Sequence, residues 1–241
     1  ALNKNVGTFF LGLGLPVLQG YGQTESAPFI SVNRPSKIKV ETVGPPLKNT
    51  SVKIAEDGEI LVKGELVTFG YWRDKASTEE ILKDGWLHTG DIGIIDEDGH
   101  IKITDRKKDI IVLDKGHNVS PQRIEGVLSL QEEISQAMVY GDKKPHLVAL
   151  IVPESEWLIK WAHDNNKPNR LQDLKSDKDL HRALAKSVGQ LNSTLSNLER
   201  VRKFTIANEA FTIENEQMTP TLKIRRHVIS ELYRNEIEGL Y

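Results

Sequence analysis

Two Asp-Gly pairs, each lying between alternating apolar residues, constrain the fold of this 241-residue chain more than any other feature. Asp57-Gly58 lies within Ser51 to Val62, and Asp98-Gly99 lies within Ile92 to Ile103. An Asp-Gly pair accepts the backbone angles of a tight hairpin turn, and alternation places every second side chain on one face of a strand. We therefore predict two β-hairpins and a mainly β structure over residues 1–104.

Upstream of the hairpins, residues 8–13 are mostly apolar and lead into a second apolar run, Leu15 to Leu18. We interpret this pattern as a helix end followed by a buried strand that breaks at Gly20-Tyr21-Gly22. The chain opens at Ala1 inside a segment that already has the pattern of mid-domain helix and strand. We therefore expect the chain to be a fragment.

The second half of the chain has the pattern of a small α+β layer. Ser120-Pro121 marks a helix start, because Ser caps free amides and Pro fits the first helical position, and the helix should run to about Leu130. Two strands are expected next, at Ala137 to Tyr140 and Leu147 to Val152, joined by the polar turn Gly141 to His146.

Residues 154–198 have helical spacing with polar interruptions, and Phe204 to Ala207 indicates one more strand. A terminal helix is expected to have one apolar face, formed by Ile224, Val228, Leu232 and Tyr233. Between the two halves lies the charged run Thr104 to Asp109, which is either a hairpin turn or a linker.

Composition excludes several classes of protein. Lys and Arg number 32 and Asp and Glu 34, so the net charge of -2 gives no electrostatic case for a nucleic-acid binder. The chain contains no Cys, which excludes disulfides and thiolate zinc sites within it, and its seven His are scattered. No apolar run approaches the ~18 to 20 residues of a membrane-spanning helix. We expect a cytoplasmic protein.

The loop from Gly20 to Ser26 follows the first expected strand, where α/β sheets commonly bind ligands. The Tyr21 ring can stack on a base, the Thr24 hydroxyl can bind a phosphate oxygen, and the Glu25 carboxylate can hold Mg²⁺. An ordinary Gly turn explains the same pattern.

Asp91 closes a second motif, Gly85 to Asp91, and its carboxylate could accept two hydrogen bonds from a ribose diol. Arg106 lies beyond the second hairpin, which can return its guanidinium to Asp91. A structural ion pair explains this arrangement equally well. For the run Arg106 to Asp109, a solvated charged turn is the interpretation we favour.

Two further motifs carry candidate residues. Lys115 to Pro121 is a Gly-containing loop entering a helix, with amides available for an anion or a closely lying ligand chain, although many such loops are purely structural. Lys223 lies near the expected start of the last helix, where the helix dipole disfavours a cation. This position favours a role for Lys223 outside helix stabilisation.

The order of the motifs is more specific than any one of them: YGQTE, GYW, GWLHTGD, DRKKDIIV, KGHNVSPQRIE and TPTLKIRR. Together they resemble the AMP-forming acyl-CoA synthetases, from about Leu15 to the C-terminus. The RKKDIIVLDKG spacing and the TPTLK ending look most like long-chain fatty acid-CoA ligases. The resemblance implies an enzyme that joins a fatty acid to ATP, releases pyrophosphate, and passes the acyl group from AMP to coenzyme A.

The resemblance also implies a domain organisation. Residues 1–104 would be the β-rich end of a large α/β adenylate-forming N-terminal domain, residues 105–109 a hinge, and residues 110–241 a small, mobile α+β C-terminal domain. Lys108 matches the family's hinge position, about which the C-terminal domain would swing between the two half-reactions.

Residue roles are implied wherever the motifs match. The nucleotide-binding set would be Tyr21, Gly22, Thr24, Asp91 and Arg106. Within it, Tyr21 would stack on adenine and Thr24 would contact the α-phosphate. Asp91 and Arg106 would grip the ribose.

Outside the nucleotide set, Glu25 would help to hold Mg²⁺. Lys223 matches the catalytic lysine, whose ammonium stabilises charge on the carboxylate and α-phosphate oxygens during adenylation. Gly116 and His117 would line the path of the coenzyme A pantetheine.

Two features depart from the family's pattern. We find no Ser/Thr/Gly-rich phosphate loop ending in Pro-Lys-Gly, so this fragment alone is not expected to turn over. Leu222 stands where many relatives place Gly before the catalytic lysine, which predicts a stiffer lysine loop.

Three hypotheses follow. The first is the C-terminal part of a long-chain fatty acid-CoA ligase, whose partners are a fatty acid, ATP and coenzyme A. The second is a fatty acyl-AMP ligase or another adenylating enzyme with a different acceptor, such as a carrier protein. The third is a non-catalytic adenylate-fold binding module, which the joint presence of Lys223, Asp91, Arg106 and Glu25 argues against, because a scaffold needs no such set.

A long-chain substrate implies delivery from membranes, which is compatible with peripheral membrane contact. Glu156 to Trp161 could supply an amphipathic surface for such contact. We favour a core-facing helix as the interpretation of this stretch.

Overall fold

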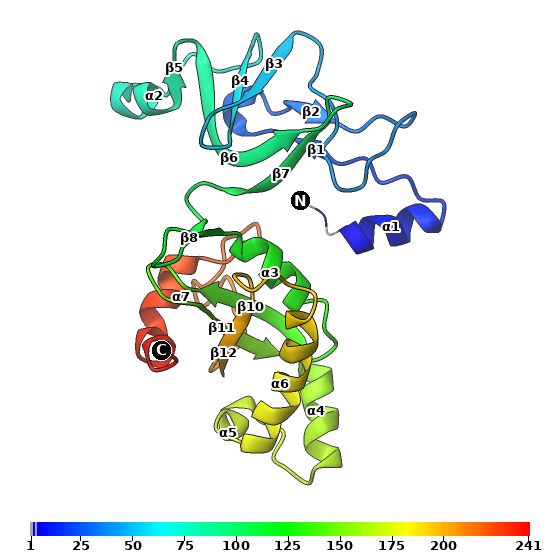
Figure 1. The fold of residues 1–241 in the computed structure, drawn as a ribbon, viewed down its shortest axis with the longest axis vertical. Coiled ribbons are helices and arrows are strands. Elements are labelled where there is room, and N and C mark those ends of the chain that lie inside the picture. The colour runs from blue at the N-terminus through cyan, green and yellow to red at the C-terminus, as the bar shows by residue number, and fades with distance from the viewer. Residues whose placement is uncertain (1, 3) are drawn as a thin grey trace. The chain divides into compact units, whose positions relative to one another are not determined.

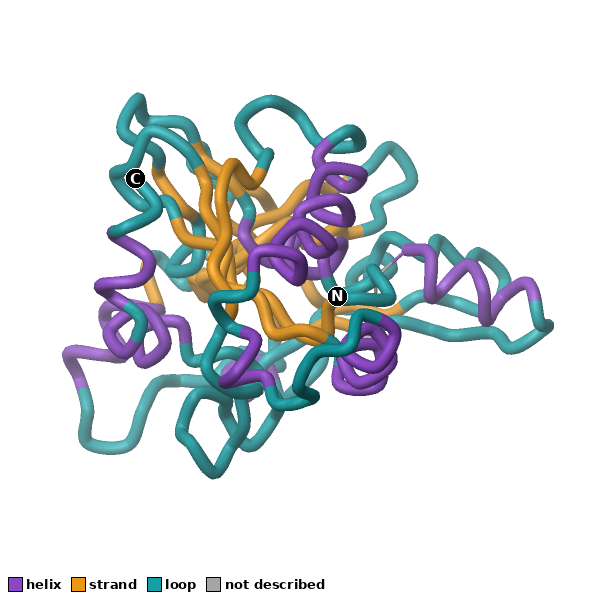
Figure 2. The backbone as a smooth tube through the Cα atoms, turned by 90° about the horizontal axis from the view of Figure 1, so that it is seen from below, coloured by secondary structure: helices purple, strands orange, loops and turns teal. Residues whose placement is uncertain are grey.

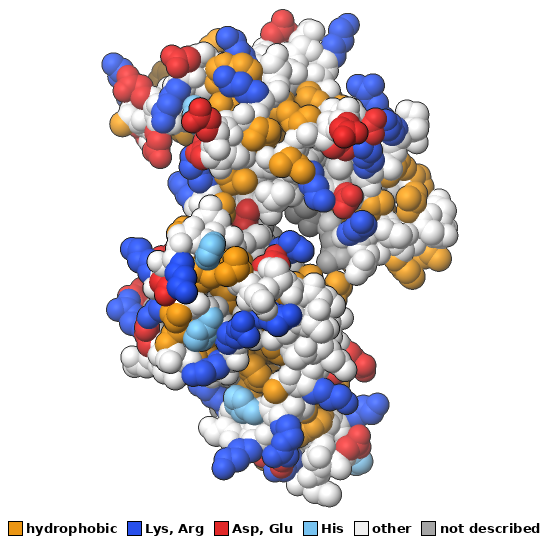
Figure 3. Space-filling model, in the orientation of Figure 1, with side chains coloured by type: hydrophobic (Ala, Val, Ile, Leu, Met, Phe, Trp, Pro, Cys, Tyr) orange, Lys and Arg blue, Asp and Glu red, His pale blue; other side chains and the backbone are white. Residues whose placement is uncertain are grey.

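A computed structural model describes every residue of the chain except Ala1 and Asn3. The residues divide into two compact units, Ala1–Asp109 and Ile110–Tyr241 (Figure 1). In the part of the chain that the structure describes, no helix is both long enough and apolar enough to cross a bilayer. Basic and acidic side chains both occur on each unit on the face shown in Figure 3, as the net charge of -2 leads one to expect.

A five-stranded antiparallel sheet forms the body of the first unit. β3 (Thr50–Ile54) pairs with β4 (Glu59–Gly64), and β6 (Trp86–Ile95) pairs with β7 (Ile101–Arg106), which confirms both predicted hairpins. β6 also pairs with β4 and with the short β5 (Leu82–Lys83), so it joins the two hairpins into one sheet.

Short elements surround this sheet. α1 spans Lys4–Gly12, and β1 (Gly20–Tyr21) pairs with β2 (Ser31–Val32) on either side of the 3-10 helix η1 (Thr24–Ser26). α2 (Lys75–Ile81) begins after Asp74, whose carboxylate accepts the Ser77 amide and so caps the helix.

The predicted buried strand at Leu15–Leu18 is wrong. These residues form no strand, and the side chains of Leu15 and Leu18 are exposed. The physical reason is that a strand needs a pairing partner, and no described strand pairs with this run. Pairing begins only at Gly20, with Val32.

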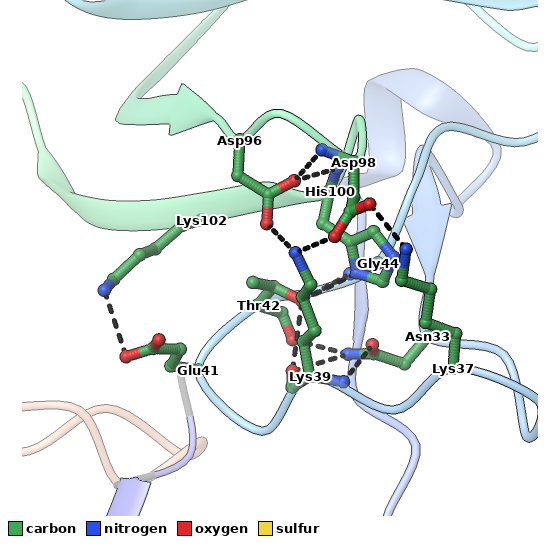
Figure 4. A network of polar contacts seen from close by, with 10 residues as sticks. All are labelled: Asn33, Lys37, Lys39, Glu41, Thr42, Gly44, Asp96, Asp98, His100 and Lys102. Atoms are coloured by element: carbon green, nitrogen blue, oxygen red, sulfur yellow. Dashed lines mark hydrogen bonds and ion pairs between the residues drawn. The ribbon is translucent and has the colours of Figure 1, made fainter.

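A polar network holds the turn between β6 and β7 against the loop that precedes β3 (Figure 4). The Lys39 ammonium lies 2.5 Å from the Asp96 carboxylate and 2.6 Å from that of Asp98. Beneath them the buried His100 ring contacts the Thr42 hydroxyl at 3.1 Å. These contacts fix one end of the β6–β7 hairpin, whose other end carries the candidate site.

The second unit contains a three-stranded sheet in the order β10 (Ile134–Tyr140), β11 (Leu147–Pro153) and β12 (Val201–Ile206). β11 lies antiparallel to β10 and parallel to β12, and all its residues are buried. Alternate β11 residues face two different cores: Leu147, Ala149 and Ile151 one, and Val148, Leu150 and Val152 the other. Both faces of the sheet are therefore covered (Figure 2).

Helices on either side supply these cores. α3 (Pro121–Leu128), α4 (Ser155–Asp164) and α6 (Lys178–Asn192) contribute to one, while α7 (Arg226–Leu232) and α8 (Arg234–Glu238) contribute to the other. The two predicted strands lie within β10 and β11, and the third, expected at 204–207, is β12, which begins earlier and ends at Ile206.

The Ser120 hydroxyl accepts the Arg123 amide, which confirms the predicted start of α3, although the helix ends at Leu128 rather than Leu130. In α4, Leu158 is buried and Trp157 and Trp161 pack against the core. The core-facing interpretation of this helix is therefore the one the structure supports.

The predicted face of the terminal helix is only partly correct. Tyr233 is buried as predicted, together with Ile229 and Ile237, and Ile224 packs on the same core but precedes the helix in a bridge with Met218. Leu232 is exposed, contrary to the prediction. The buried stripe follows the helical spacing i, i+4, i+8 from Ile229, across the point where α7 ends at Leu232 and α8 begins at Arg234, and this spacing leaves Leu232 off the stripe, on the exposed side.

The charged run Thr104–Asp109 does not turn a hairpin. Its first residues continue β7, and the Asp109 amide donates to the Arg106 carbonyl at 2.9 Å to close a turn. β7 pairs with β6, whereas the next strand, β8 (Ile111–Val112), pairs with β9 (Asn118–Val119). The run therefore connects the two units.

Candidate active site

Asp91 is the centre of a polar cluster in the first unit. β6 and β7 place Asp91 and Arg106 as register partners, and β1 supplies Tyr21. Arg106 Nε donates to Asp91 Oδ1 at 2.9 Å, and the Tyr21 hydroxyl donates to Asp91 Oδ2 at 2.7 Å. The structure thus brings together three of the residues that the sequence singled out.

The cluster is buried at its acidic end and open at its basic end. The Asp91 side chain is 6% exposed, whereas that of Arg106 is 52% exposed. Burial and the Asp91 charge raise the pKa of Tyr21 well above its usual range, so its hydroxyl stays a donor. Each Asp91 oxygen has two lone pairs and uses one for these bonds, so a ligand diol could occupy the others.

The Tyr21 ring is 8% exposed and belongs to the core of the first unit. The structure therefore shows Tyr21 as a buried partner of Asp91, and its stacking on adenine stays a prediction. The next residue, Gly22, has no room for a side chain, because a Cβ there would lie 1.6 Å from the Pro28 carbonyl oxygen.

Glu25, on η1, has a partner that the sequence analysis missed. Its Oε1 accepts a 2.6 Å hydrogen bond from the Tyr71 hydroxyl, and this bond raises the pKa of Tyr71 to about 12. The Thr68 amide also donates to the Glu25 carbonyl at 2.8 Å. Thr24 beside it is exposed. The GYW motif had marked the region of Tyr71 in the sequence. Its pairing with Glu25 was not visible there, because the two residues are 46 positions apart.

The fit of Glu25 to Mg²⁺ can be tested on its surroundings. Among the described residues, no group of three or more His, Asp or Glu side chains is placed to hold a metal ion, so Glu25 does not belong to an all-protein metal cage. Mg²⁺ is commonly held by one or two carboxylates, several waters and the phosphates of its substrate. One partly exposed carboxylate beside the exposed hydroxyl of Thr24 fits that pattern.

Beside Asp91, a cavity of about 660 Å³ has a buried acid in its lining, Glu59. Glu59 accepts the Gly90 amide at 2.8 Å and contacts His88 Nδ1 and Lys107 Nζ, each at 3.1 Å. Burial opposes ionisation, but the Gly90 amide, His88 and Lys107 together hold the pKa of Glu59 below its usual value. Glu59 therefore fixes the backbone amide of Gly90, the residue before Asp91.

Glu59 was missed by the sequence analysis, although an acid at the head of the apolar run Ile60 to Val62 was a visible signal. Its neighbour Lys107 is anchored further, because its amide donates to the Gly90 carbonyl at 2.8 Å. Lys108, the next residue, is exposed.

Lys223 lies in the second unit, in a tight loop and not at a helix start, because α7 begins only at Arg226. The Thr219 amide donates to the Lys223 carbonyl at 2.8 Å, and the Lys223 amide donates to the Thr219 hydroxyl at 3.1 Å. Leu222 has a φ of 58°, in the region that favours Gly. The Lys223 side chain is exposed.

Gly116 and His117 form the exposed turn between β8 and β9, also in the second unit. Gly116 has a φ of 79°, and nothing lies within 4 Å of the position of a Cβ there. The backbone angle therefore explains this Gly, and the open space beside it leaves room for a ligand chain.

Two family models match the chain. Residues 1–72 match the AMP-binding enzyme model, and residues 108–241 match the AMP-binding enzyme C-terminal domain model. The chain belongs to the AMP-binding enzyme family. This membership confirms the family that the six ordered motifs predicted.

As a member of the AMP-binding enzyme family, the chain resembles named ligases. It is 40% identical to long-chain-fatty-acid-CoA ligase FadD15 of Mycobacterium bovis, over 100% of this chain and 40% of that protein. It is 35% identical to long-chain-fatty-acid-CoA ligase 1 of Homo sapiens, over 95% of this chain and 35% of that protein. The chain spans about two fifths or less of the length of these relatives.

Two solved structures share the fold. The adenylation domain of a carboxylate reductase from Mycobacterium chelonae matches with a TM-score of 0.81 at 22% identity, over 100% of this chain and 37% of that one. O-succinylbenzoate coenzyme A synthetase of Bacillus subtilis, in complex with ATP and magnesium ion, matches with a TM-score of 0.70 at 25% identity, over 94% and 44%. The predicted mixed α/β and α+β fold class is confirmed.

Proposed function

We propose that the protein carrying this chain is a long-chain fatty acid-CoA ligase of the AMP-forming type. It would activate a fatty acid with ATP to acyl-AMP and pyrophosphate, and then transfer the acyl group to the thiol of coenzyme A. Identity of 34–40% to curated ligases over 95–100% of the chain supports this proposal. The observation that carries it is the Tyr21–Asp91–Arg106 cluster, which offers a buried carboxylate and an open guanidinium to one ligand.

In this proposal, residues 1–104 belong to the large N-terminal domain, residues 105–109 form the hinge, and residues 110–241 form the mobile C-terminal domain. The pivot would be Lys108. The contacts of Lys107 with Gly90, Asp57 and Glu59 tie the residue before the pivot to the first unit. Rotation would then be confined to the residues that follow it.

The nucleotide would be held by residues of the first unit. Asp91 would accept hydrogen bonds from the ribose diol, and the half-exposed Arg106 would fix the carboxylate while facing the ligand. Thr24 would donate to the α-phosphate, with Gly22 and the Tyr21 ring against the base. Glu25 would hold Mg²⁺, which when bound neutralises phosphate charge.

Lys223 would stabilise charge that develops between the fatty acid carboxylate and the α-phosphate. Its exposed ammonium on a short, hydrogen-bonded loop suits that role, because it is available and its backbone is fixed. In the other orientation of the C-terminal domain, Gly116 and His117 would line the pantetheine path. A cytoplasmic location and peripheral contact with membranes, from which long-chain fatty acids are delivered, complete the proposal.

Product analysis tests the proposal. The full-length protein, given ATP, Mg²⁺ and palmitate, should yield palmitoyl-CoA with coenzyme A, and palmitoyl-AMP and pyrophosphate without it. Transfer to a carrier protein but not to coenzyme A would identify an acyl-AMP ligase instead. The 241-residue chain alone should yield no product. Absence of palmitate-dependent pyrophosphate from the full-length protein would contradict the proposal.

A further inference from the structure

The start of α7 is tied to α3 by a bidentate ion pair. Arg226 Nη1 donates to Glu125 Oε1 at 2.7 Å, and Nη2 donates to Oε2 at 2.9 Å. The Glu125 side chain is 10% exposed and that of Arg226 is 23% exposed. Two parallel N–H···O bonds fix the direction of a side chain as well as its distance, which the single ammonium of a Lys does not.

The same two side chains bind the backbone of β10, which is one of the two edge strands of the sheet. The Val139 amide donates to Glu125 Oε1 at 2.7 Å, and the Val139 carbonyl accepts from Arg226 Nη1 at 3.0 Å. Among the described strands, β10 pairs with β11 alone, so none of them offers a partner to these groups of Val139. The ion pair takes the place of a further strand here, and it fastens the first residue of α7 to the sheet.

Arg226 is also one of the points at which the Lys223 loop joins the rest of the unit. The loop is closed at its base by the bridge between Met218 and Ile224, and by the Arg225 amide, which donates to the Gln217 carbonyl at 2.8 Å. Met218 and Ile224 also pack against the core on this face of the sheet, and Gln136 of β10 donates to Met218 Sδ at 3.6 Å. The bidentate contact that adds a fixed direction, two residues beyond Ile224, is the Glu125–Arg226 pair.

We propose that Glu125 and Arg226 are positioning residues for Lys223, which hold its loop in one orientation on the sheet. The inference rests on the proposed role of Lys223 in adenylation. Lys223 has no part in the thioester-forming step as proposed above. Weakening the Glu125–Arg226 pair should therefore slow adenylation and leave thioester formation unchanged. General destabilisation of the fold would slow both half-reactions.

The activity test uses two variants of the full-length protein. Arg226→Lys keeps the positive charge but cannot form the two parallel hydrogen bonds, and Glu125→Gln removes the negative charge. Palmitate-dependent ATP-pyrophosphate exchange should fall about tenfold to a hundredfold, because small misplacements of a catalytic group have effects of that order. Formation of palmitoyl-CoA from supplied palmitoyl-AMP and coenzyme A should stay at the wild-type rate. Arg123→Met is the matched control, since Arg123 is also on α3 but pairs with Glu199.

A second readout does not depend on activity. In the 241-residue chain, hydrogen exchange of residues 217–226 should accelerate in both variants, while β11 and β12 keep their protection. Unchanged exchange in residues 217–226, or a loss of protection that spreads through β11 and β12, would overturn the inference. So would an equal fall in both half-reactions. A wild-type protein without pyrophosphate exchange would instead contradict the proposed function, and hydrogen exchange would still decide the positioning role.

Discussion

The Tyr21 hydroxyl donates a 2.7 Å hydrogen bond to the carboxylate of Asp91, 70 residues further along the chain. This bond joins β1 to the β6–β7 hairpin, and Arg106 binds the other oxygen of the same carboxylate. Two of the sequence motifs therefore share one buried charge. The cluster has a structural role and a proposed nucleotide-binding role, and two substitutions can separate them.

Tyr21→Phe tests the structural role. It keeps the ring but leaves a buried carboxylate oxygen without its donor, so we expect the free energy of unfolding to fall by about 1–3 kcal/mol. Tyr71→Phe is the matched control, because its bond to Glu25 is partly exposed and should matter less. Urea unfolding of the 241-residue chain measures both. Equal effects of the two substitutions would contradict the account.

Asp91→Asn tests nucleotide binding. The amide keeps the shape but loses the charge and one acceptor, so the dissociation constant for AMP should rise about tenfold to a hundredfold, as expected for one charged hydrogen bond. Calorimetric titration of the full-length protein measures it. Asp96→Asn, at the other end of the same hairpin, should leave AMP binding unchanged. Loss of affinity in both variants would attribute the effect to the hairpin and not to the carboxylate.

Glu59 predicts a dependence of stability on pH. Its pKa is lowered in the folded protein, so its contribution is present above the usual value of 4.5 and is lost as the pH falls through the folded value. Glu59→Gln should therefore reduce the loss of stability between neutral and acid pH, measured as the urea midpoint at each pH. Glu56→Gln, at an exposed neighbour, should leave that loss unchanged. A pH dependence as steep in Glu59→Gln as in wild type would contradict this prediction.

The positive φ of Leu222 predicts how the stability of the protein responds to a Gly substitution at this position. A left-handed conformation costs a non-Gly residue about 1–2 kcal/mol, while a new Gly costs about 0.4–1 kcal/mol through the unfolded chain. Leu222→Gly should therefore leave stability unchanged or slightly raised, whereas Leu222→Ala, which keeps a Cβ at a φ of 58°, should gain nothing. Thermal unfolding compares the two. A clear loss of stability in Leu222→Gly alone would show that the conformation is not strained.

Local patterns predicted the parts of the fold that depend on neighbours in sequence. The Asp57-Gly58 and Asp98-Gly99 turns gave both hairpins, and the Ser120 cap gave the start of α3. Apolar content alone failed at Leu15–Leu18, because burial of a strand depends on a partner that periodicity does not reveal. The terminal helix was predicted only in part, because the predicted face included the exposed Leu232 and omitted Ile229 and Ile237, which share the buried stripe with Tyr233.

In the candidate site too, contacts between neighbours in a hairpin could be predicted, and contacts between distant elements could not. Asp91 and Arg106 could be expected to meet, because a hairpin with a known turn makes them neighbours. The bonds of Glu25 with Tyr71, and of Glu125 with Arg226, span 46 and 101 residues and depend on packing between elements. No local pattern encodes such pairs, although the residue types at the ends of each pair were already suited to them.

The central claim is that Lys223 promotes adenylation of a fatty acid. Palmitate-dependent ATP-pyrophosphate exchange by the full-length protein and its Lys223→Ala variant tests it most directly. The account predicts a fall of about 10² to 10³ in the variant, by analogy with the loss of one oxyanion donor. Conversion of supplied palmitoyl-AMP and coenzyme A to palmitoyl-CoA should continue at the wild-type rate. Exchange at the wild-type rate in Lys223→Ala would contradict the account.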